Sequence, residues 1–301
     1  VISDVEGGSA LSVAMGRHPN AFDKVFISMV AAGEASGTLD KALERLANQQ
    51  EKDAEIISKV KGAMIYPAVV MGVMALVVGF MLVKVLPQVE VLYNDLPGAT
   101  LPVVTRLLLA ISHAITKYWY IVIVITVISG LLLNRWSKTS GGKSVFDKLK
   151  MTAWPIGRLF MKVYMARFSR TGATLVSSGV PLLQMLQITG NAISNVHIET
   201  ALRKASEKVK GGKSLADSLD GDPNFLPLVP NMLRIGEQSG ALESMLEKVA
   251  DYYEKEVDTE IRNVSSIIEP ALMVILGVFA FIIVAAVLLP IYGLAGQNLG
   301  G

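Results

Sequence analysis

Three long stretches of the chain carry almost no charged side chain, and they determine the architecture that the sequence predicts. They cover residues 64–86, 113–134 and 270–293. Each has the length of about 20 residues that a helix needs to cross a ~30 Å hydrocarbon core, where a helix satisfies its own backbone. A basic and aromatic cluster at 117–120 is typical of a membrane interface. We therefore predict three transmembrane helices.

Outside these stretches the apolar positions follow a helical period. Apolar side chains recur every three or four residues over 38–61 and over 241–268, with charged residues on the opposite face. Such a stripe is typical of an amphipathic helix packed on a bundle. We see no stretch with the alternation of a β-strand, so the sequence predicts an all-α polytopic membrane protein.

The chain also repeats itself. The sequence at 33–39, GEASGTL, matches the sequence at 236–242, GEQSGAL. Two pairs of prolines keep the same register: Pro67 with Pro270, and Pro87 with Pro290. We therefore predict two duplicated cytoplasmic helical-bundle domains, each leading through a long helix into a span. The first copy enters at the equivalent of Gly211, so we expect its domain to be N-terminally incomplete.

Composition supports a membrane location and limits the chemistry. Hydrophobic residues make up 51% of the chain and charged residues 18%, whereas a soluble domain is about 25% charged. A net charge of +2 is too small to indicate nucleic-acid binding, and we predict none. The absence of cysteine excludes disulfides and thiolate chemistry.

Positive charge is distributed unevenly around the spans. Residues 135–170 hold nine lysines or arginines and a single acid, Asp147, whereas the segment after Pro290 holds no charged side chain. Because loops rich in Lys and Arg stay in the cytoplasm, we expect most of the chain on the cytoplasmic side and the C-terminus outside. The predicted segments are a first cytoplasmic helical domain (1–63), a span (64–86), an outer periplasmic loop (87–112), a span (113–134), a second cytoplasmic helical domain (135–269), a span (270–293) and an outer tail (294–301).

The repeated Gly-Glu-x-Ser-Gly-x-Leu element is the most specific motif. We interpret its second glycine as the left-handed residue that ends one helix. We expect its glutamate near the start of the next helix, where a carboxylate interacts favourably with the helix dipole. A contact with a partner is compatible with this role. The residues assigned to this structural or partner motif are Gly33, Glu34, Gly37, Leu39, Gly236, Glu237, Gly240 and Leu242, together with Pro67 and Pro270, which open spans.

The first span carries a second candidate surface. Ala68, Gly72, Ala75 and Gly79 recur at i, i+4, i+7 and i+11, so they share one face of a helix. Such a small-residue face is suited to close helix packing, although small residues are common in membrane helices in any case.

Nothing in the sequence indicates catalysis. The strings at 141–144 and 211–214 resemble part of a phosphate-binding loop, but Ser137 and Glu207 stand where that motif needs its first glycine. The three histidines have no metal-ligand spacing, and the spans hold no carboxylate. We predict no enzyme activity, and no catalytic, cofactor-binding or metal-binding residue.

Together these features resemble one family, the inner-membrane platform proteins of type IV pilus and type II secretion machines. The resemblance rests on the duplication, the repeated motif, the prolines that open two spans and the ending LPIYGL at 289–294. It implies a scaffold in the bacterial inner membrane that couples a cytoplasmic hexameric ATPase to the assembly or extraction of pilin or pseudopilin subunits. It also implies contacts with other inner-membrane components and with lipid, and self-association as a dimer. Pilus, secretion and DNA-uptake machines all stay open.

Two other function classes rank lower. A small-solute transporter would place its repeats mostly within the membrane, whereas most of this repeat lies outside it. A membrane-bound signalling enzyme would need a nucleotide or nucleophile site. For the platform hypothesis, candidate ATPase contacts are the charged faces at 51–55 and 254–260 and the basic stretch at 138–150.

Overall fold

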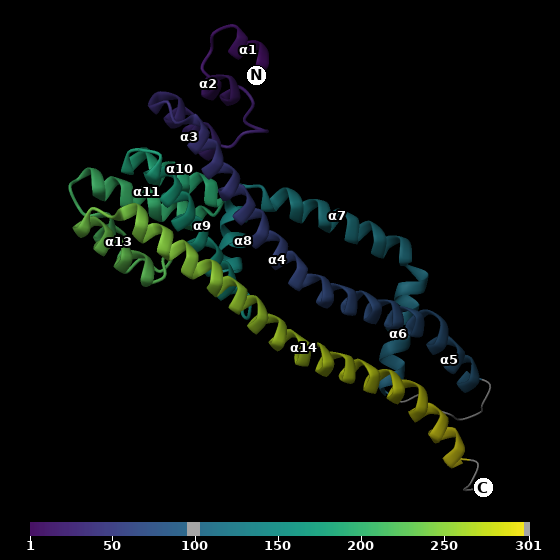
Figure 1. The fold of residues 1–301 in the computed structure, drawn as a ribbon. Coiled ribbons are helices and arrows are strands. Elements are labelled where there is room, and N and C mark those ends of the chain that lie inside the picture. Colours follow the sequence, from purple (N-terminus) through teal and green to yellow (C-terminus); the bar gives the residue numbers. More distant parts are fainter. Residues whose placement is uncertain (95–102, 298–301) are drawn as a thin grey trace. The chain divides into compact units, whose positions relative to one another are not determined.

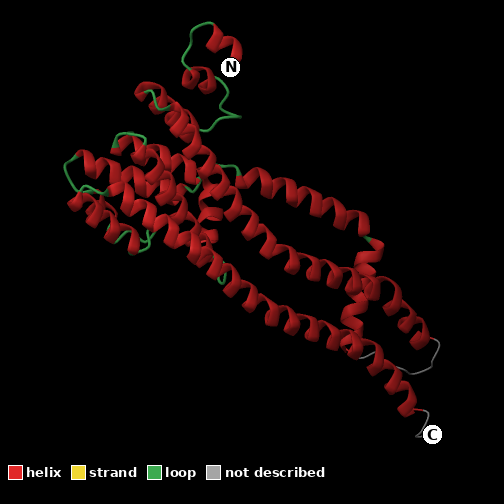
Figure 2. Cartoon of the chain, in the orientation of Figure 1, coloured by secondary structure: helices red, strands yellow, loops and turns green. Residues whose placement is uncertain are grey.

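The computed structural model describes residues 1–94 and 103–297, and every regular element in that part of the chain is helical (Figure 2). This confirms the all-α prediction. Parts of the predicted outer loop (95–102) and outer tail (298–301) lie outside the described residues. The elements are α1 Ile2–Glu6, α2 Leu11–Gly16, α3 Lys24–Ser36, α4 Leu39–Phe80, the π-helical turn η1 Met81–Val85, α5 Leu86–Asn94, α6 Val103–Lys117, α7 Trp119–Ser137, α8 Ser140–Thr152, α9 Gly157–Ser177, α10 Leu182–Ile193, α11 Val196–Lys210, α12 Leu215–Leu219, α13 Leu228–Ser239 and α14 Leu242–Gln297 (Figure 1).

These elements form two compact units. The first unit combines Val1–Lys61 with Ser137–Val264, and the second combines Gly62–Trp136 with Ser265–Gly301. The long helices α4 and α14 each contribute residues to both units. Each unit is described separately below.

Short polar side chains begin several helices of the first unit. Asp23 accepts a hydrogen bond from the Phe26 backbone N–H at the start of α3, and Asn195 accepts two at the start of α11. Thr139 and Ser214 do the same for α8 and α12. Such caps supply acceptors for N–H groups that the first turn of a helix leaves unpaired.

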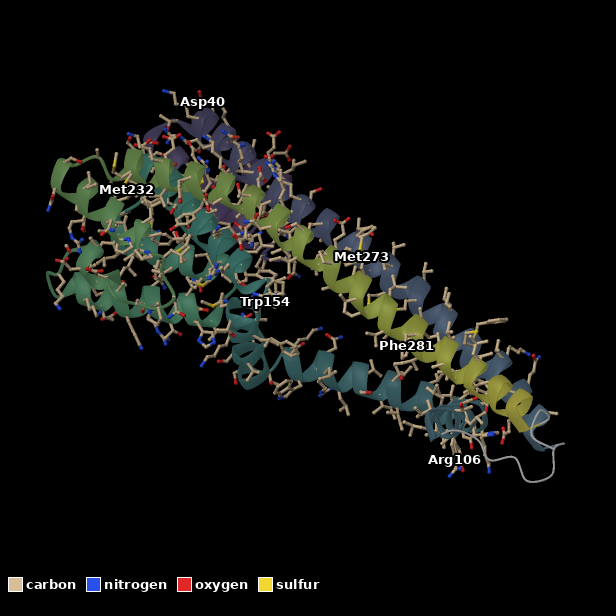
Figure 3. All side chains as sticks on the ribbon, turned by 90° about the horizontal axis from the view of Figure 1, so that it is seen from below. Asp40, Arg106, Trp154, Met232, Met273 and Phe281 are labelled. Carbon is tan, nitrogen blue, oxygen red and sulfur yellow. The ribbon has the colours of Figure 1, made fainter. Side chains whose placement is uncertain are left out.

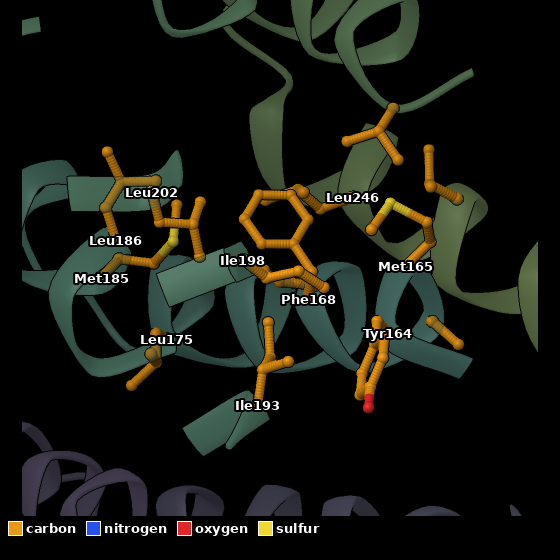
Figure 4. Close-up of a cluster of buried hydrophobic side chains, with 14 of the residues drawn as sticks. Tyr164, Met165, Phe168, Leu175, Met185, Leu186, Ile193, Ile198, Leu202 and Leu246 are labelled. Atoms are coloured by element: carbon orange, nitrogen blue, oxygen red, sulfur yellow. The ribbon is translucent and has the colours of Figure 1, made fainter. Parts of the chain in front are cut away.

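Helix α9 lies at the centre of the first unit, and most of its side chains are buried. Phe168 is fully buried and meets Phe225 edge to face, with the ring centroids 5.3 Å apart. Figure 4 shows Phe168 among Met165, Ile198 and Leu246, which come from α9, α11 and α14. The same hydrophobic cluster includes residues of α3 and α4, so segments from both copies of the repeat share one core.

Many large apolar side chains of the second unit are exposed. Three helices of the described chain are long and apolar enough to cross a membrane, and they lie within Leu39–Val91, Trp119–Ser137 and Leu242–Leu288. Met273 and Phe281 on α14 are 67% and 73% exposed (Figure 3). Because outward-facing apolar side chains suit a lipid environment, the three helices agree with the three predicted spans.

Two details differ from the pattern seen in the sequence. Pro67 and Pro270 do not begin helices, because each lies inside a continuous helix, α4 or α14. The helix of the second span, α7, begins at Trp119, whereas His113 belongs to α6.

Candidate functional site

The repeated motif ends a helix in the same way in both copies. Gly37 follows α3 with φ 68°, and Gly240 follows α13 with φ 66°. The backbone N–H of the next residue then donates to the carbonyl of the first glycine of the motif, Gly33 or Gly236, at 2.9 Å in both copies. A left-handed glycine with this backward hydrogen bond is a common helix ending, which reverses the chain into the next helix.

The first glycine of the motif allows two helices to touch. A Cβ placed on Gly33 would lie 2.7 Å from the Cβ of Ala42, and a Cβ placed on Gly236 would lie 3.0 Å from the Cα of Leu242. Both distances are below ordinary carbon–carbon contact, so any larger residue would push the two helices of the turn apart. Gly33 and Gly236 therefore set the spacing of α3 against α4 and of α13 against α14.

The glutamate of the motif binds the start of a helix other than the one expected. We expected Glu34 and Glu237 near the starts of α4 and α14, but they bind the starts of α2 and α12. Glu237 accepts hydrogen bonds from the backbone N–H groups of Leu215, at 2.6 Å, and Ala216, at 3.0 Å. In the first copy, Glu34 accepts from the corresponding N–H groups of residues 11 and 12 and from the Ser12 hydroxyl. The glutamate of the motif thus ties the start of a short helix, α2 or α12, to the helix that follows it, α3 or α13.

Acid should weaken this contact in the first copy. Hydrogen bonds from the hydroxyl and backbone of Ser12 lower the pKa of Glu34, although desolvation opposes them. A lowered pKa means that the contribution of Glu34 to stability is present above its unfolded value of about 4.3 and is lost as pH falls through the folded value. We expect Glu34→Gln to lower the free energy of unfolding by about 1 kcal/mol near pH 7, as loss of a helix cap does, and the difference from the parent to shrink as pH falls below about 4.3.

Chemical unfolding of the purified full chain in detergent, followed from pH 3 to pH 7, measures this difference. Glu44→Gln is the matched control, because Glu44 is an exposed acid on α4. Parallel pH curves for the parent and Glu34→Gln would contradict the assignment.

The remaining motif residues are structural neighbours of the turn or lie in long helices. Leu39 and Leu242 are partly buried against the hydrophobic core. The small-residue face of the first span stays open: Ala68, Gly72 and Ala75 are exposed, and nothing in the described chain lies within 4 Å of a Cβ added at Gly72 or Gly79. The structure therefore brings the motif residues of each copy together but leaves the helix-packing face without a neighbour among the described residues.

The carboxylates at 254–260, which we proposed as an ATPase contact, form ion pairs with basic side chains of α9. Lys162 of α9 binds Glu256 at 2.8 Å and Glu260 at 2.7 Å. Arg170, two turns later on α9, binds Glu254 at 2.8 Å. These side chains are mostly buried, so the carboxylates at 254–260 hold α14 on α9.

A set of polar contacts joins the two copies, and sequence reasoning did not find it. The amide of Gln49 donates to the Thr171 hydroxyl at 3.1 Å and accepts from the Thr174 hydroxyl at 3.2 Å. One turn away, Asp53 pairs with Arg167 at 3.5 Å. More than 110 residues separate the partners in each case, so no local pattern could have indicated these contacts.

The described residues offer no evident site for a metal or phosphate group. They contain no cluster of three His, Cys, Asp or Glu residues that could hold a metal ion. The string at 141–144 lies in the first turns of α8, and the string at 211–214 forms the turn between α11 and α12. Ser214 is the N-cap of α12, so its hydroxyl serves that helix.

Comparison with known proteins identifies a family. The family model described as "Type II secretion system (T2SS), protein F" matches residues 1–87 and 168–290. The type IV pilus assembly protein PilC of Thermus thermophilus is 38% identical over 297 residues, which cover 98% of this chain and 73% of that protein. PilC of Myxococcus xanthus is 37% identical over 98% of this chain and 70% of its own length. The type II secretion system protein F of Aeromonas hydrophila is 35% identical over 97% of this chain and 75% of its own length. These matches confirm the resemblance seen in the sequence, and the chain belongs to the type II secretion system protein F family, which includes the PilC proteins of type IV pilus assembly.

Proposed function

We propose that this chain is a non-enzymatic platform protein of the bacterial inner membrane in a type IV pilus or type II secretion machine. The observation that carries the proposal is the match of nearly the whole chain to relatives named for pilus assembly and for type II secretion. The three apolar helices support a location in the membrane. A transporter is not favoured, because none of these relatives is named as one.

The proposed arrangement has two duplicated helical domains, at 1–63 and 135–269, on the cytoplasmic side, with the C-terminus outside. The basic stretch after the second span supports this orientation. The matching turns at Gly37 and Gly240, and the matching contacts of Glu34 and Glu237, support the duplication.

Because the chain lacks cysteine, a single engineered cysteine can test the orientation. We expect Val91→Cys on α5 to react with a membrane-impermeant maleimide in spheroplasts, and Lys148→Cys on α8 to react only after the membrane is permeabilised. Both positions are exposed, so burial does not protect either thiol. Labelling of Lys148→Cys but not Val91→Cys in intact spheroplasts would reverse the proposed topology.

The proposed role is mechanical coupling. A cytoplasmic hexameric ATPase would move the helical domains, and the spans would move pilin or pseudopilin subunits into or out of a fibre. Helices α4 and α14 support this role, because each continues without a break from residues of the first unit into an apolar span. A continuous helix transmits displacement along its axis more directly than a flexible linker does. Self-association as a dimer and contacts with other inner-membrane components and with lipid complete the proposal.

Affinity capture tests the proposal. The tagged full-length protein is purified from membranes of its host in mild detergent, and captured proteins are identified by mass spectrometry against an untagged control. We expect a secretion-type ATPase together with pilin or pseudopilin. Recovery of neither, combined with substrate-dependent uptake by the reconstituted protein, would overturn the platform role in favour of transport.

A further inference from the structure

Two prolines related by the repeat, Pro87 and Pro290, each deprive a helix of one hydrogen-bond donor. Proline has no backbone N–H, so the carbonyl four residues earlier in an α-helix loses its partner. Helix α14 runs through Pro290, and the carbonyl that loses its donor there belongs to Ala286. In an apolar membrane such a group finds little water and costs free energy unless another donor reaches it.

In the first copy of the repeat a carbonyl also lacks its backbone donor, but there the local geometry is that of a π-helix. Around Met81–Val85 the chain forms a π-helical turn, and the N–H of Leu86 donates to the carbonyl of Met81, five residues earlier. With that spacing, the carbonyl of Leu82 would take its hydrogen bond from residue 87. Residue 87 is proline, so this carbonyl also lacks a backbone donor.

One short helix, α6, supplies a donor to both carbonyls. The Ser112 hydroxyl donates to the Leu82 carbonyl at 2.5 Å, and the Thr105 hydroxyl donates to the Ala286 carbonyl at 3.3 Å. Ser112 and Thr105 are fully buried. All four residues belong to the second unit, in which α6 crosses near α5 and α14 (Figure 1).

The spacing of the two hydroxyls on α6 fits this arrangement. Thr105 and Ser112 are seven residues apart, which places them on one face of the helix, with Leu109 between them. Leu109 is buried together with Leu86 and Ala286, so an apolar contact accompanies the two hydrogen bonds. On a neighbouring face of α6, His113 binds Glu90 of α5 at 2.7 Å.

We propose that α6 is a clamp, the α6 clamp, that fastens the first and third membrane helices to each other at the two carbonyls freed by Pro87 and Pro290. Ser112 serves the first helix and Thr105 serves the third. The two helices and α6 then move as one body at this level, so neither span can shift alone without exposing an unpaired carbonyl. This inference does not depend on the proposed function, because it concerns contacts within the chain.

Double-mutant cycles on the full-length protein in nanodiscs test the clamp, with amide hydrogen exchange of residues 103–117 as the readout. Ser112→Ala is expected to speed exchange about three- to tenfold, the range that membrane hydrogen bonds support. In the Pro87→Ala background, a restored N–H can serve the freed carbonyl, so adding Ser112→Ala should change exchange by less than about twofold. Thr105→Val should show the same coupling to Pro290→Ala.

The crossed combinations are the matched controls. Ser112→Ala should keep its full effect in the Pro290→Ala background, and Thr105→Val should keep its full effect in the Pro87→Ala background. Equal effects of Ser112→Ala in all three backgrounds, or no effect in the parent, would overturn the clamp. If Ser112→Ala fails to accumulate, the Pro87→Ala/Ser112→Ala variant decides, since recovery supports the clamp and continued absence points to packing alone.

Discussion

Replacement of Glu254, Glu256 and Glu260 by lysine is expected to lower the free energy of unfolding of the unit around α9 by at least about 3–5 kcal/mol. Lys162 and Arg170 are each about four-fifths buried and donate their hydrogen bonds to these carboxylates. Reversal would replace three attractive contacts by repulsion between like charges that water screens poorly. Chemical unfolding in detergent, followed by tryptophan fluorescence and circular dichroism, measures the change.

Two variants show whether stability falls because the ion pairs with α9 are lost or because the surface charge has changed in general. The exchange Arg170→Glu/Glu254→Lys keeps a pair of opposite charges. Made together with Asp251→Asn, which removes the second acidic partner of Arg170, it should recover at least half of the stability lost in Glu254→Lys. Glu247→Lys reverses an exposed carboxylate of the same helix and should change stability by less than about 0.5 kcal/mol. If the triple reversal is as stable as the parent, the ion pairs of α9 do not hold α14 in place.

These ion pairs also change how an ATPase contact should be sought. A triple reversal that abolished ATPase binding would not locate the contact, because it would also loosen α14 from α9. Lys148 in the basic stretch at 138–150 is the better probe, because it is exposed and can be replaced at less cost to the fold. Lys150 is less suitable, because it pairs with the buried Asp147.

Local features of this fold could be predicted from the sequence. The three spans follow from long apolar runs that hold almost no charged residue, and the length and apolarity of these runs together separate them from core helices. The left-handed turn at Gly37 and Gly240 is also local, because the glycine and the carbonyl that receives the backward hydrogen bond lie within five residues. The repeat made the turn recognisable, since the same glycines recur in one register.

Contacts between distant residues could not be predicted in this way. Glu237 binds the backbone of Leu215, 22 residues earlier, and any helix start in the same bundle would have offered a similar site. The contact of Gln49 with Thr171 spans 122 residues and joins two copies that the repeat shows only as separate. The role of Ser112 depends on a π-helical turn, which the pattern of apolar residues does not indicate. In each case the sequence contains the polar group but not the identity of its partner.

Phe168→Ala is expected to destabilise the first unit by about 3–5 kcal/mol, the cost typical of removing a buried aromatic side chain and leaving a cavity. Phe168 is fully buried in the centre of α9, and the substitution removes its edge-to-face contact with Phe225. Phe168→Leu fills most of the space and should cost less. Thermal unfolding of the purified full chain in detergent measures both variants.

Phe281→Ala is the matched control, because it removes the same side chain from an exposed position on the apolar part of α14. This variant leaves no internal cavity, so we expect its stability to stay within about 1 kcal/mol of the parent. The core around Phe168 contains residues of α3 and α4 as well as those of α9 to α14. Phe168→Ala should therefore loosen the segments of both copies in one transition, whereas separate transitions for Val1–Lys61 and Ser137–Val264 would show that the copies fold independently.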